Sequence, residues 1–278
     1  MAMPKLEQVI PKPETRVAIV VDNSSSMNSL KEFVVNTFNE QVDELRKVKD
    51  QKITVSLVFF DSDVDVRMFN VPLEEIKNLK MEDYRPAGMT ALDDATGVTV
   101  DKFKSIDGWQ DENVSHLVVV ITDGYGNVNK EFSQQNVANM IKELQDGKGW
   151  TFTYLGANVD VKKIARTYNL HDGNTMSYSA SDKVSLNAST EATTRGLGGY
   201  FRGRSKGLRT SMSFYDAQGD NIMEQGKKLE ISNEEDKNNL TDKGEDAKLD
   251  IHMGNKDLWD QALDANDKKS QEIKEKTK

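Results

Sequence analysis

Two apolar runs that each lead into an aspartate constrain the fold of this chain more than any other feature. The runs at residues 17–21 and 117–121 contain only Val, Ala, Ile and Leu. Continuous apolar runs rich in β-branched residues are typical of strands buried on both faces of a sheet. Asp22 follows the first run directly, and Asp123 follows the second after one threonine. We therefore expect two buried strands, each leading into a carboxylate.

The rest of the folded part alternates strand-like and helix-like segments. Strands are expected at 16–22, 53–60, 64–68, 116–122, 150–155 and 175–178. Helices are expected at 29–49, 73–79, 90–106, 132–144 and 159–168, and from about 182 to 200 with Ser181 as the cap. This alternation predicts an α/β fold with a Rossmann-like, doubly wound and mainly parallel sheet. The segment 64–68 alternates apolar and charged residues, which predicts an antiparallel strand at the sheet edge.

Oxygen-bearing side chains gather where the first strand turns into a helix. The pattern Asp22-x-Ser24-x-Ser26 places a carboxylate and two hydroxyls there. Hard divalent cations such as Mg²⁺ prefer oxygen ligands, and ligands of doubly wound sheets bind beyond the carboxyl ends of the strands. The alternative is that Ser24 or Ser26 only caps the helix. Two distant segments add further oxygens: Thr90 opens a helical stretch, and Asp123 ends the second buried strand.

These three segments, in this order, resemble the von Willebrand factor A (vWA) family and its metal-ion-dependent adhesion site. The resemblance covers about residues 16–202, and the later stretches 152–158 and 191–195 are similar to small cytosolic bacterial and phage members. It implies the vWA fold, with the two aspartate-bearing strands as neighbours, and a metal site formed by Asp22, Ser24, Ser26, Thr90 and Asp123. Family members often carry two glycines before the threonine, and Met89 replaces the second here, which affects loop shape rather than ligation.

The resemblance also implies a function and an ion. The expected cofactor is Mg²⁺, with Ca²⁺ or Mn²⁺ as alternatives, and the expected partner is a protein that offers an Asp or Glu to the metal. The chain would then be a non-enzymatic, metal-dependent protein-binding module. The alternative is a structural or assembly component, such as a phage virion protein, that uses the fold as a scaffold. Residues 203–207 fit the Gly-x-Ser-x-Gly spacing of some hydrolases, but no strand precedes them, so we expect no catalytic residues.

The composition restricts the cellular compartment and the class of partner. The chain has 278 residues, a formal net charge of −9 and no cysteine. Without cysteine there are neither disulfides nor thiolate metal sites, which fits a reducing compartment and predicts a cytoplasmic protein. Residues 1–14 lack the apolar core of a signal peptide, and no apolar run approaches the roughly 20 residues of a membrane span. An acidic chain is also a poor candidate for non-specific nucleic-acid binding.

Three regions are expected along the chain: a lead at 1–15, the vWA domain at 16–202, and a basic linker with an acidic, solvated extension at 203–278. Segment 195–209 is basic with interleaved aromatic residues. Such a segment can bind single-stranded nucleic acid, which is a lesser alternative function. The favoured interpretation is a helix end followed by a linker.

Overall fold

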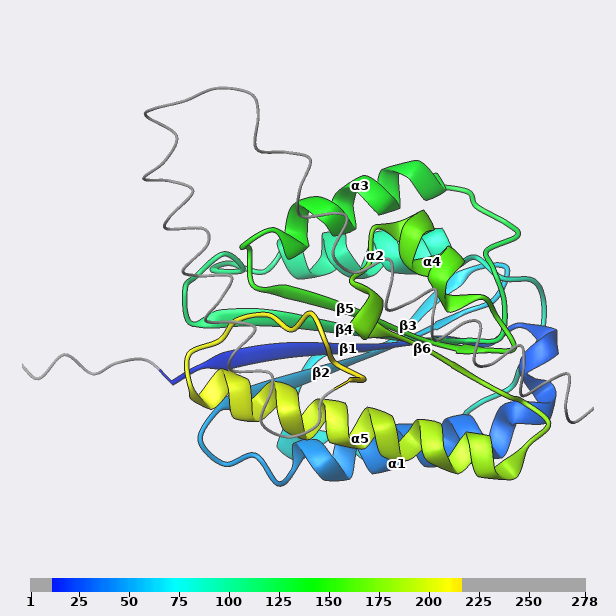
Figure 1. Cartoon of the computed structure of the whole chain (residues 1–278), viewed down its shortest axis with the longest axis horizontal. Helices are drawn as coiled ribbons and strands as arrows, with labels where there is room; N and C mark the ends of the chain where they lie inside the picture. The colour runs from blue at the N-terminus through cyan, green and yellow to red at the C-terminus, as the bar shows by residue number, and fades with distance from the viewer. Residues whose placement is uncertain (1–11, 217–278) are drawn as a thin grey trace, which may run out of the picture. The chain divides into compact units, whose positions relative to one another are not determined.

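The structure is a computed structural model that describes residues 12–216. Most of the expected lead (1–15) and most of the expected extension (203–278) therefore lie outside the described residues. The described part contains one sheet and the helices that cover it (Figure 1).

The elements alternate along the chain as expected for an α/β fold. The strands are β1 (Glu14–Asp22), β2 (Lys52–Phe60), β3 (Val64–Pro72), β4 (Val114–Thr122), β5 (Trp150–Ala157) and β6 (Thr175–Tyr178). The α-helices are α1 (Lys31–Leu45), α2 (Leu92–Lys104), α3 (Gln134–Gln145), α4 (Val161–Tyr168) and α5 (Lys183–Ser205). Short 3₁₀ helices are η1 (Ser25–Leu30), η2 (Leu73–Glu75) and η3 (Asp172–Asn174).

The strand order confirms the predicted doubly wound sheet. The order is β3-β2-β1-β4-β5-β6, and every neighbouring pair is parallel except β2 with β3. The predicted antiparallel edge strand is therefore β3. After β1 the chain adds β2 and β3 on one side, and it then returns to add β4, β5 and β6 on the other. The direction of winding reverses between β1 and β4, which is where such sheets bind ligands.

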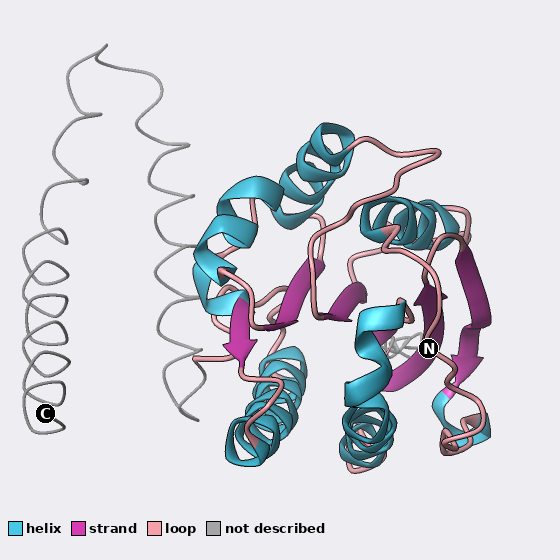
Figure 2. Cartoon of the chain, turned by 90° about the vertical axis from the view of Figure 1, so that its right-hand side faces the viewer, coloured by secondary structure: helices cyan, strands magenta, loops and turns pink. Residues whose placement is uncertain are grey.

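Helices cover both faces of the sheet, as Figures 1 and 2 show. Helices α1 and α5 lie on one face, and α2, α3 and α4 lie on the other. The buried runs explain this arrangement, because successive strand residues point to opposite faces. In β1, Val17 and Ile19 belong to the core beneath α1 and α5, whereas Ala18 and Val20 belong to the core beneath α2 and α3.

Some helix ends differ from expectation. The helix expected at 73–79 is only the single turn η2, because residues 76–80 run without regular structure between contacts with α1. One such contact is the hydrogen bond from the Leu79 N–H to Asn39 Oδ1, 2.7 Å long. The cap of α5 is Asp182 rather than Ser181, and its carboxylate accepts hydrogen bonds from the N–H groups of Val184 and Ser185.

The packed unit also continues past the expected boundary at residue 202. Helix α5 runs on to Ser205, and Arg204 is buried and donates to the backbone oxygens of Glu14 and Asn113. Phe214 is 1% exposed and belongs to the core beneath α1 and α5. Residues 203–216 are therefore part of the folded body instead of a linker.

Candidate functional site

The two aspartates leave the sheet side by side, as expected. Strands β1 and β4 are parallel neighbours, and Val21 at the end of β1 pairs with Ile121 of β4. Asp22 closes β1, and Asp123 follows the end of β4 by one residue. Both carboxylates therefore stand at the carboxyl edge of the sheet, at the point where its winding reverses.

Asp22 is buried and held by hydrogen bonds at both carboxylate oxygens. The backbone N–H of Ser24 donates to Oδ1 at 2.8 Å, and the hydroxyl of Thr122 donates to Oδ2 at 2.6 Å. Burial raises the pKa of Asp22 to about 6, and the hydrogen bonds from Thr122 and Ser24 oppose that shift. The charge of Asp123 nearby raises the pKa further. A cation at this edge would relieve the repulsion between the two carboxylates.

The serine hydroxyls connect the loop after β1 to the loop after β4. Ser24 Oγ lies 3.0 Å from Ser26 Oγ, and Ser26 Oγ donates to Asp123 Oδ1 at 2.8 Å. Ser24 stands at the start of η1, but its side chain makes no capping hydrogen bond. The alternative that Ser24 only caps a helix is therefore not supported. The two hydroxyls instead form a chain of contacts, from Ser24 to Ser26, that ends at the carboxylate of Asp123.

The Thr90 segment is tied to both of these loops. The backbone N–H of Thr90 donates to Asn127 Oδ1 at 2.8 Å, and the N–H of Asn127 donates to the Thr90 carbonyl at 2.9 Å. On the other side, the Ser25 N–H donates to the Gly88 carbonyl at 3.2 Å. Thr90 is 4% exposed. The structure thus brings the threonine segment to the edge where Asp22 and Asp123 emerge.

Several supporting residues were not identified from the sequence. The hydroxyl of Tyr84, a fully buried side chain, donates to the backbone oxygen of Asp22. Asp94 accepts hydrogen bonds from the N–H groups of residues 130, 131 and 132, which fixes the far end of the loop after β4. Among the residues that support the site, only Thr122 had a local signal in the sequence, because it directly precedes Asp123. Tyr84 and Asn127 carry none, because their partners are distant in the sequence.

These side chains have the chemistry that a hard divalent cation requires. Asp22 and Asp123 would supply charge, and Ser24, Ser26 and Thr90 would supply neutral hydroxyl oxygens. Within residues 12–216, no group of three or more His, Cys, Asp or Glu side chains is placed to hold a metal ion. The candidate set differs from such a group because it depends on hydroxyls and has only two carboxylates.

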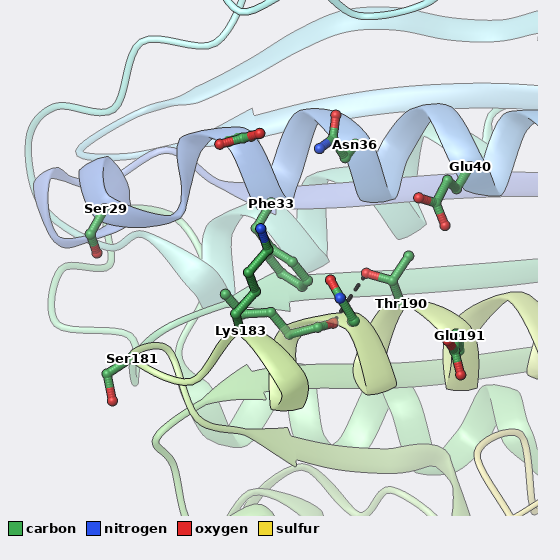
Figure 3. A pocket seen from close by; sticks show the side chains of 11 residues that line it. Ser29, Phe33, Asn36, Glu40, Ser181, Lys183, Thr190 and Glu191 are labelled. Carbon is green, nitrogen blue, oxygen red and sulfur yellow. Dashed lines mark hydrogen bonds between the residues drawn. The ribbon is translucent and has the colours of Figure 1, made fainter.

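A groove of about 560 Å³ lies elsewhere, between α1 and α5 (Figure 3). Phe33 of α1 and Thr190 of α5 line it, and the Thr190 hydroxyl lies 3.0 Å from that of Thr37. Its walls carry Glu40 and Glu191. None of the candidate metal-binding residues lines this groove.

The remaining expectations concern the basic segment and the membrane. In segment 195–209, Tyr200 and Phe201 are each 3% exposed. Their rings are not accessible for stacking on bases, so the structure does not support the nucleic-acid alternative. Among the residues described, no helix has the length and apolar character needed to cross a membrane. The cytoplasmic location stays a prediction.

Comparison with solved structures finds related folds at low sequence identity. Proximal thread matrix protein 1 from the mussel byssus is 17% identical, with a TM-score of 0.51 over 66% of this chain and 46% of that chain. The PilB minor pilin from Streptococcus sanguinis is 14% identical, with a TM-score of 0.49 over 67% of this chain and 62% of that chain. The manganese-loaded Plasmodium vivax TRAP protein is 15% identical, with a TM-score of 0.44 over 63% and 72%. This chain thus spans less than half of the mussel protein.

Comparison with sequence families identifies the fold family directly. A search of curated proteins found no match. The family model described as von Willebrand factor type A domain matches residues 17–192, which is more than half of the chain. The match begins in β1 and ends within α5, so it includes most of β1, the other five strands and all five candidate residues. The chain belongs to the von Willebrand factor type A domain family.

Proposed function

We propose that this protein is a divalent-metal-dependent protein-binding module. Domains of this family are commonly metal-dependent adhesion or protein-interaction modules. In the proposed site, Asp22, Ser24, Ser26, Thr90 and Asp123 form a metal-ion-dependent adhesion site. The observation that carries the proposal is the 2.8 Å hydrogen bond from the Ser26 hydroxyl to Asp123, which joins side chains 97 positions apart.

The chemistry of the donor set suggests how such a site would act. When bound, the ion supplies an electrophilic centre that accepts an anionic ligand. With one oxygen from each side chain, two carboxylates and three neutral hydroxyls do not complete the octahedral shell of Mg²⁺, which leaves a position for a further oxygen ligand. A carboxylate of a partner protein, from Asp or Glu, would complete the shell. Mg²⁺ is the proposed ion, because it favours a few carboxylates with several neutral oxygens. No residue of the site is assigned a catalytic role.

The residues around the site have defined tasks in this proposal. The hydroxyl of Thr122 orients Asp22, and Tyr84 holds its backbone. Asn127 positions Thr90 through two hydrogen bonds. These contacts lower the cost of organising the ligands when the ion binds, because the loops are already fixed.

Calorimetric titration of the purified full chain with MgCl₂, MnCl₂ and CaCl₂ tests the proposal. Asp123→Ala and Ser26→Ala should abolish or strongly weaken cation binding, because both residues face the proposed ion. Asp22→Ala should do the same, with circular dichroism confirming that the fold is retained. Asp63→Ala is the matched control, because Asp63 is an exposed carboxylate near this edge that pairs with Lys130.

Two outcomes would contradict the proposal. One is cation binding that is equally strong in wild type and in the folded Asp22 and Asp123 variants. The other is a complex with an isolated partner that survives both EDTA and the Asp22→Ala substitution. The second outcome would favour the structural alternative, in which the fold is a scaffold that needs no ion.

A further inference from the structure

Large exposed hydrophobic side chains adjoin two of the proposed metal ligands. Met89, directly before Thr90, is 50% exposed, and Tyr125, two residues after Asp123, is 38% exposed. Among the described residues, only three other large hydrophobic side chains are comparably exposed: Met81, Val184 and Met212. Met89 and Tyr125 occupy the loops that would surround a bound ion, which is where a partner would make contact.

The backbone around Met89 is fixed, so the side chain is held outward. Gly88 has a φ of +74°, a conformation that favours glycine, and a Cβ on it would lie 2.8 Å from Ser62 Oγ. The Met89 N–H donates to the same Ser62 oxygen at 3.1 Å. The flanking groups are also engaged, since the Gly88 carbonyl accepts from Ser25 and the Thr90 N–H donates to Asn127. Burying Met89 by moving the loop would break these bonds.

Tyr125 stands on the loop after β4 with a cation beside it. Its ring lies 4.9 Å from the ammonium of Lys163, which comes from α4. The preceding Gly124 is held by a hydrogen bond from the Tyr154 hydroxyl to its carbonyl, 2.8 Å long. A Cβ on Gly124 would meet nothing within 4 Å, so the space beside Gly124 is open. The Tyr125 side of the site therefore presents an exposed aromatic ring with a cation beside it.

We propose that the partner of this site is a short segment in which the metal-completing Asp or Glu lies next to a large apolar side chain. This inference rests on the proposed function. Any accessible carboxylate can complete the metal shell, so the ion alone selects poorly among acidic segments. Apolar contact with Met89 and Tyr125 supplies the selectivity, because both side chains lose exposed apolar surface when an apolar neighbour packs on them. Lys163 disfavours a segment that places a Lys or Arg against Tyr125.

A random peptide library displayed on phage tests the inference with the full chain immobilised. Selection in MnCl₂, with elution by EDTA, should enrich peptides that carry Asp or Glu within two positions of Leu, Ile, Met, Phe, Tyr or Trp. The variant Met89→Ser/Tyr125→Ser should enrich acidic peptides without this apolar neighbour. Met81→Ser is the matched control, because Met81 is 44% exposed but lies in the turn at residues 81–83, eight positions before Met89.

Binding measurements on one enriched synthetic peptide complete the test. The double variant should bind that peptide about tenfold or more weakly, which is the scale expected when an interface loses two apolar contacts. Its affinity for Mn²⁺ alone should stay unchanged, because neither substituted side chain is a proposed ligand. The Met81→Ser variant should bind both as wild type does.

The outcomes separate this inference from the proposed function. Enrichment of acidic peptides without an apolar neighbour on the wild-type chain would overturn the inference and leave the metal site in place. A wild-type chain that binds Mn²⁺ but enriches no EDTA-sensitive peptide would overturn it too. Failure of the wild-type chain to bind Mn²⁺, Mg²⁺ or Ca²⁺ would refute the proposed function itself.

Discussion

At the scale of single residues, Thr122 fixes the orientation of the Asp22 carboxylate. Its hydroxyl donates to Asp22 Oδ2 at 2.6 Å and accepts from the Gly124 N–H at 3.1 Å, so it links the ends of β1 and β4. Hydrogen bonds to metal ligands from neighbouring residues set the ligands' orientation, and their loss commonly costs about 10- to 100-fold in metal affinity. Thr122 is therefore a positioning residue for the proposed ion.

Substitution of Thr122 tests this role. Thr122→Val preserves the shape and removes the hydroxyl, and we expect the affinity for Mn²⁺ to fall by about tenfold. Thr122→Ser keeps the hydroxyl and should restore most of the affinity. Calorimetric titration measures both, and thermal unfolding in EDTA shows whether stability changes separately. Equal Mn²⁺ affinity in the valine variant and in wild type would contradict the assigned role.

His116 is a buried residue whose titration should couple stability to pH. It is 0% exposed, its ring stacks on Trp150, and its Nε2 lies 2.9 Å from the Trp109 carbonyl. Burial lowers the pKa of His116 from 6.5 to about 4. The nearby positive charges of Arg16 and Arg209 lower it further, and the hydrogen bond with Trp109 and the charge of Glu14 oppose the shift. The folded protein therefore keeps this imidazole neutral where an unfolded chain would protonate it.

The sign of the effect follows from proton binding. Between pH 6.5 and about 4 the unfolded state binds the extra proton, so the free energy of unfolding falls as pH falls through this window. The full contribution is on the order of 3 kcal/mol. His116→Gln should flatten this part of the profile, because glutamine does not titrate. Urea unfolding of both proteins at pH 7, 6, 5 and 4.5 measures the difference, and parallel profiles would contradict the prediction.

At the scale of elements, the end of α5 is anchored by one buried guanidinium. Arg204 is 3% exposed and donates to three backbone oxygens, those of Glu14, Asn113 and Leu208. These contacts tie the helix to the starts of β1 and β4. A buried carbonyl that loses its donor costs about 1–3 kcal/mol.

Arg204→Met should therefore lower the free energy of unfolding by about 2–4 kcal/mol, because it keeps much of the apolar stem and removes the guanidinium donor from these carbonyls. Arg202→Met is the matched control, since Arg202 is exposed on the same helix and should change stability little. Urea unfolding at pH 7 gives both values. Similar losses in the two variants would show that the buried hydrogen bonds contribute nothing specific.

The sequence predicted strands better than helix ends. Apolar runs located β1 and β4 to within two residues at each end, because a strand buried on both faces leaves a continuous signal. Helix ends depend on tertiary contacts that local patterns do not carry. Of the expected helix at 73–79, only the single turn η2 forms. Beyond this turn, the Leu79 N–H bonds to Asn39 instead of continuing a helix. Helix α5 extends past residue 200 because Arg204 finds partners on distant strands.

At the scale of the whole molecule, the sheet explains why the candidate site could be located from sequence. Two strands that each end near an aspartate become neighbours at the switch point, so Asp22 and Asp123 converge without any local signal between them. The loops around them were not predictable in the same way. Asn127 and Tyr84 act through hydrogen bonds to residues 37 and 62 positions away, and single-sequence patterns do not report such pairs.

The extent of the folded unit gives the last prediction. Phe214 is 1% exposed, and a Cβ on Gly196 of α5 would lie only 2.5 Å from its ring, so the two pack closely. Its N–H donates to Asn174 Oδ1 at 2.9 Å, and the Ser211 N–H donates to Thr151 Oγ1 at 2.9 Å. The segment 211–214, which follows α5, thus contacts β5, η3 and α5, and we expect the stability of the folded unit to depend on it.

A chain that ends after residue 216 should unfold cooperatively in urea, whereas a chain that ends after residue 202 should lose that cooperativity. The shorter chain lacks both Arg204 and Phe214, and it exposes core surface beneath α5. Phe214→Ala in the full chain separates packing from length, and it should cost about 3–5 kcal/mol because it leaves a cavity in the core. Equal unfolding midpoints for the two truncated chains would mean that residues 203–216 contribute no stability, in conflict with the burial of Phe214.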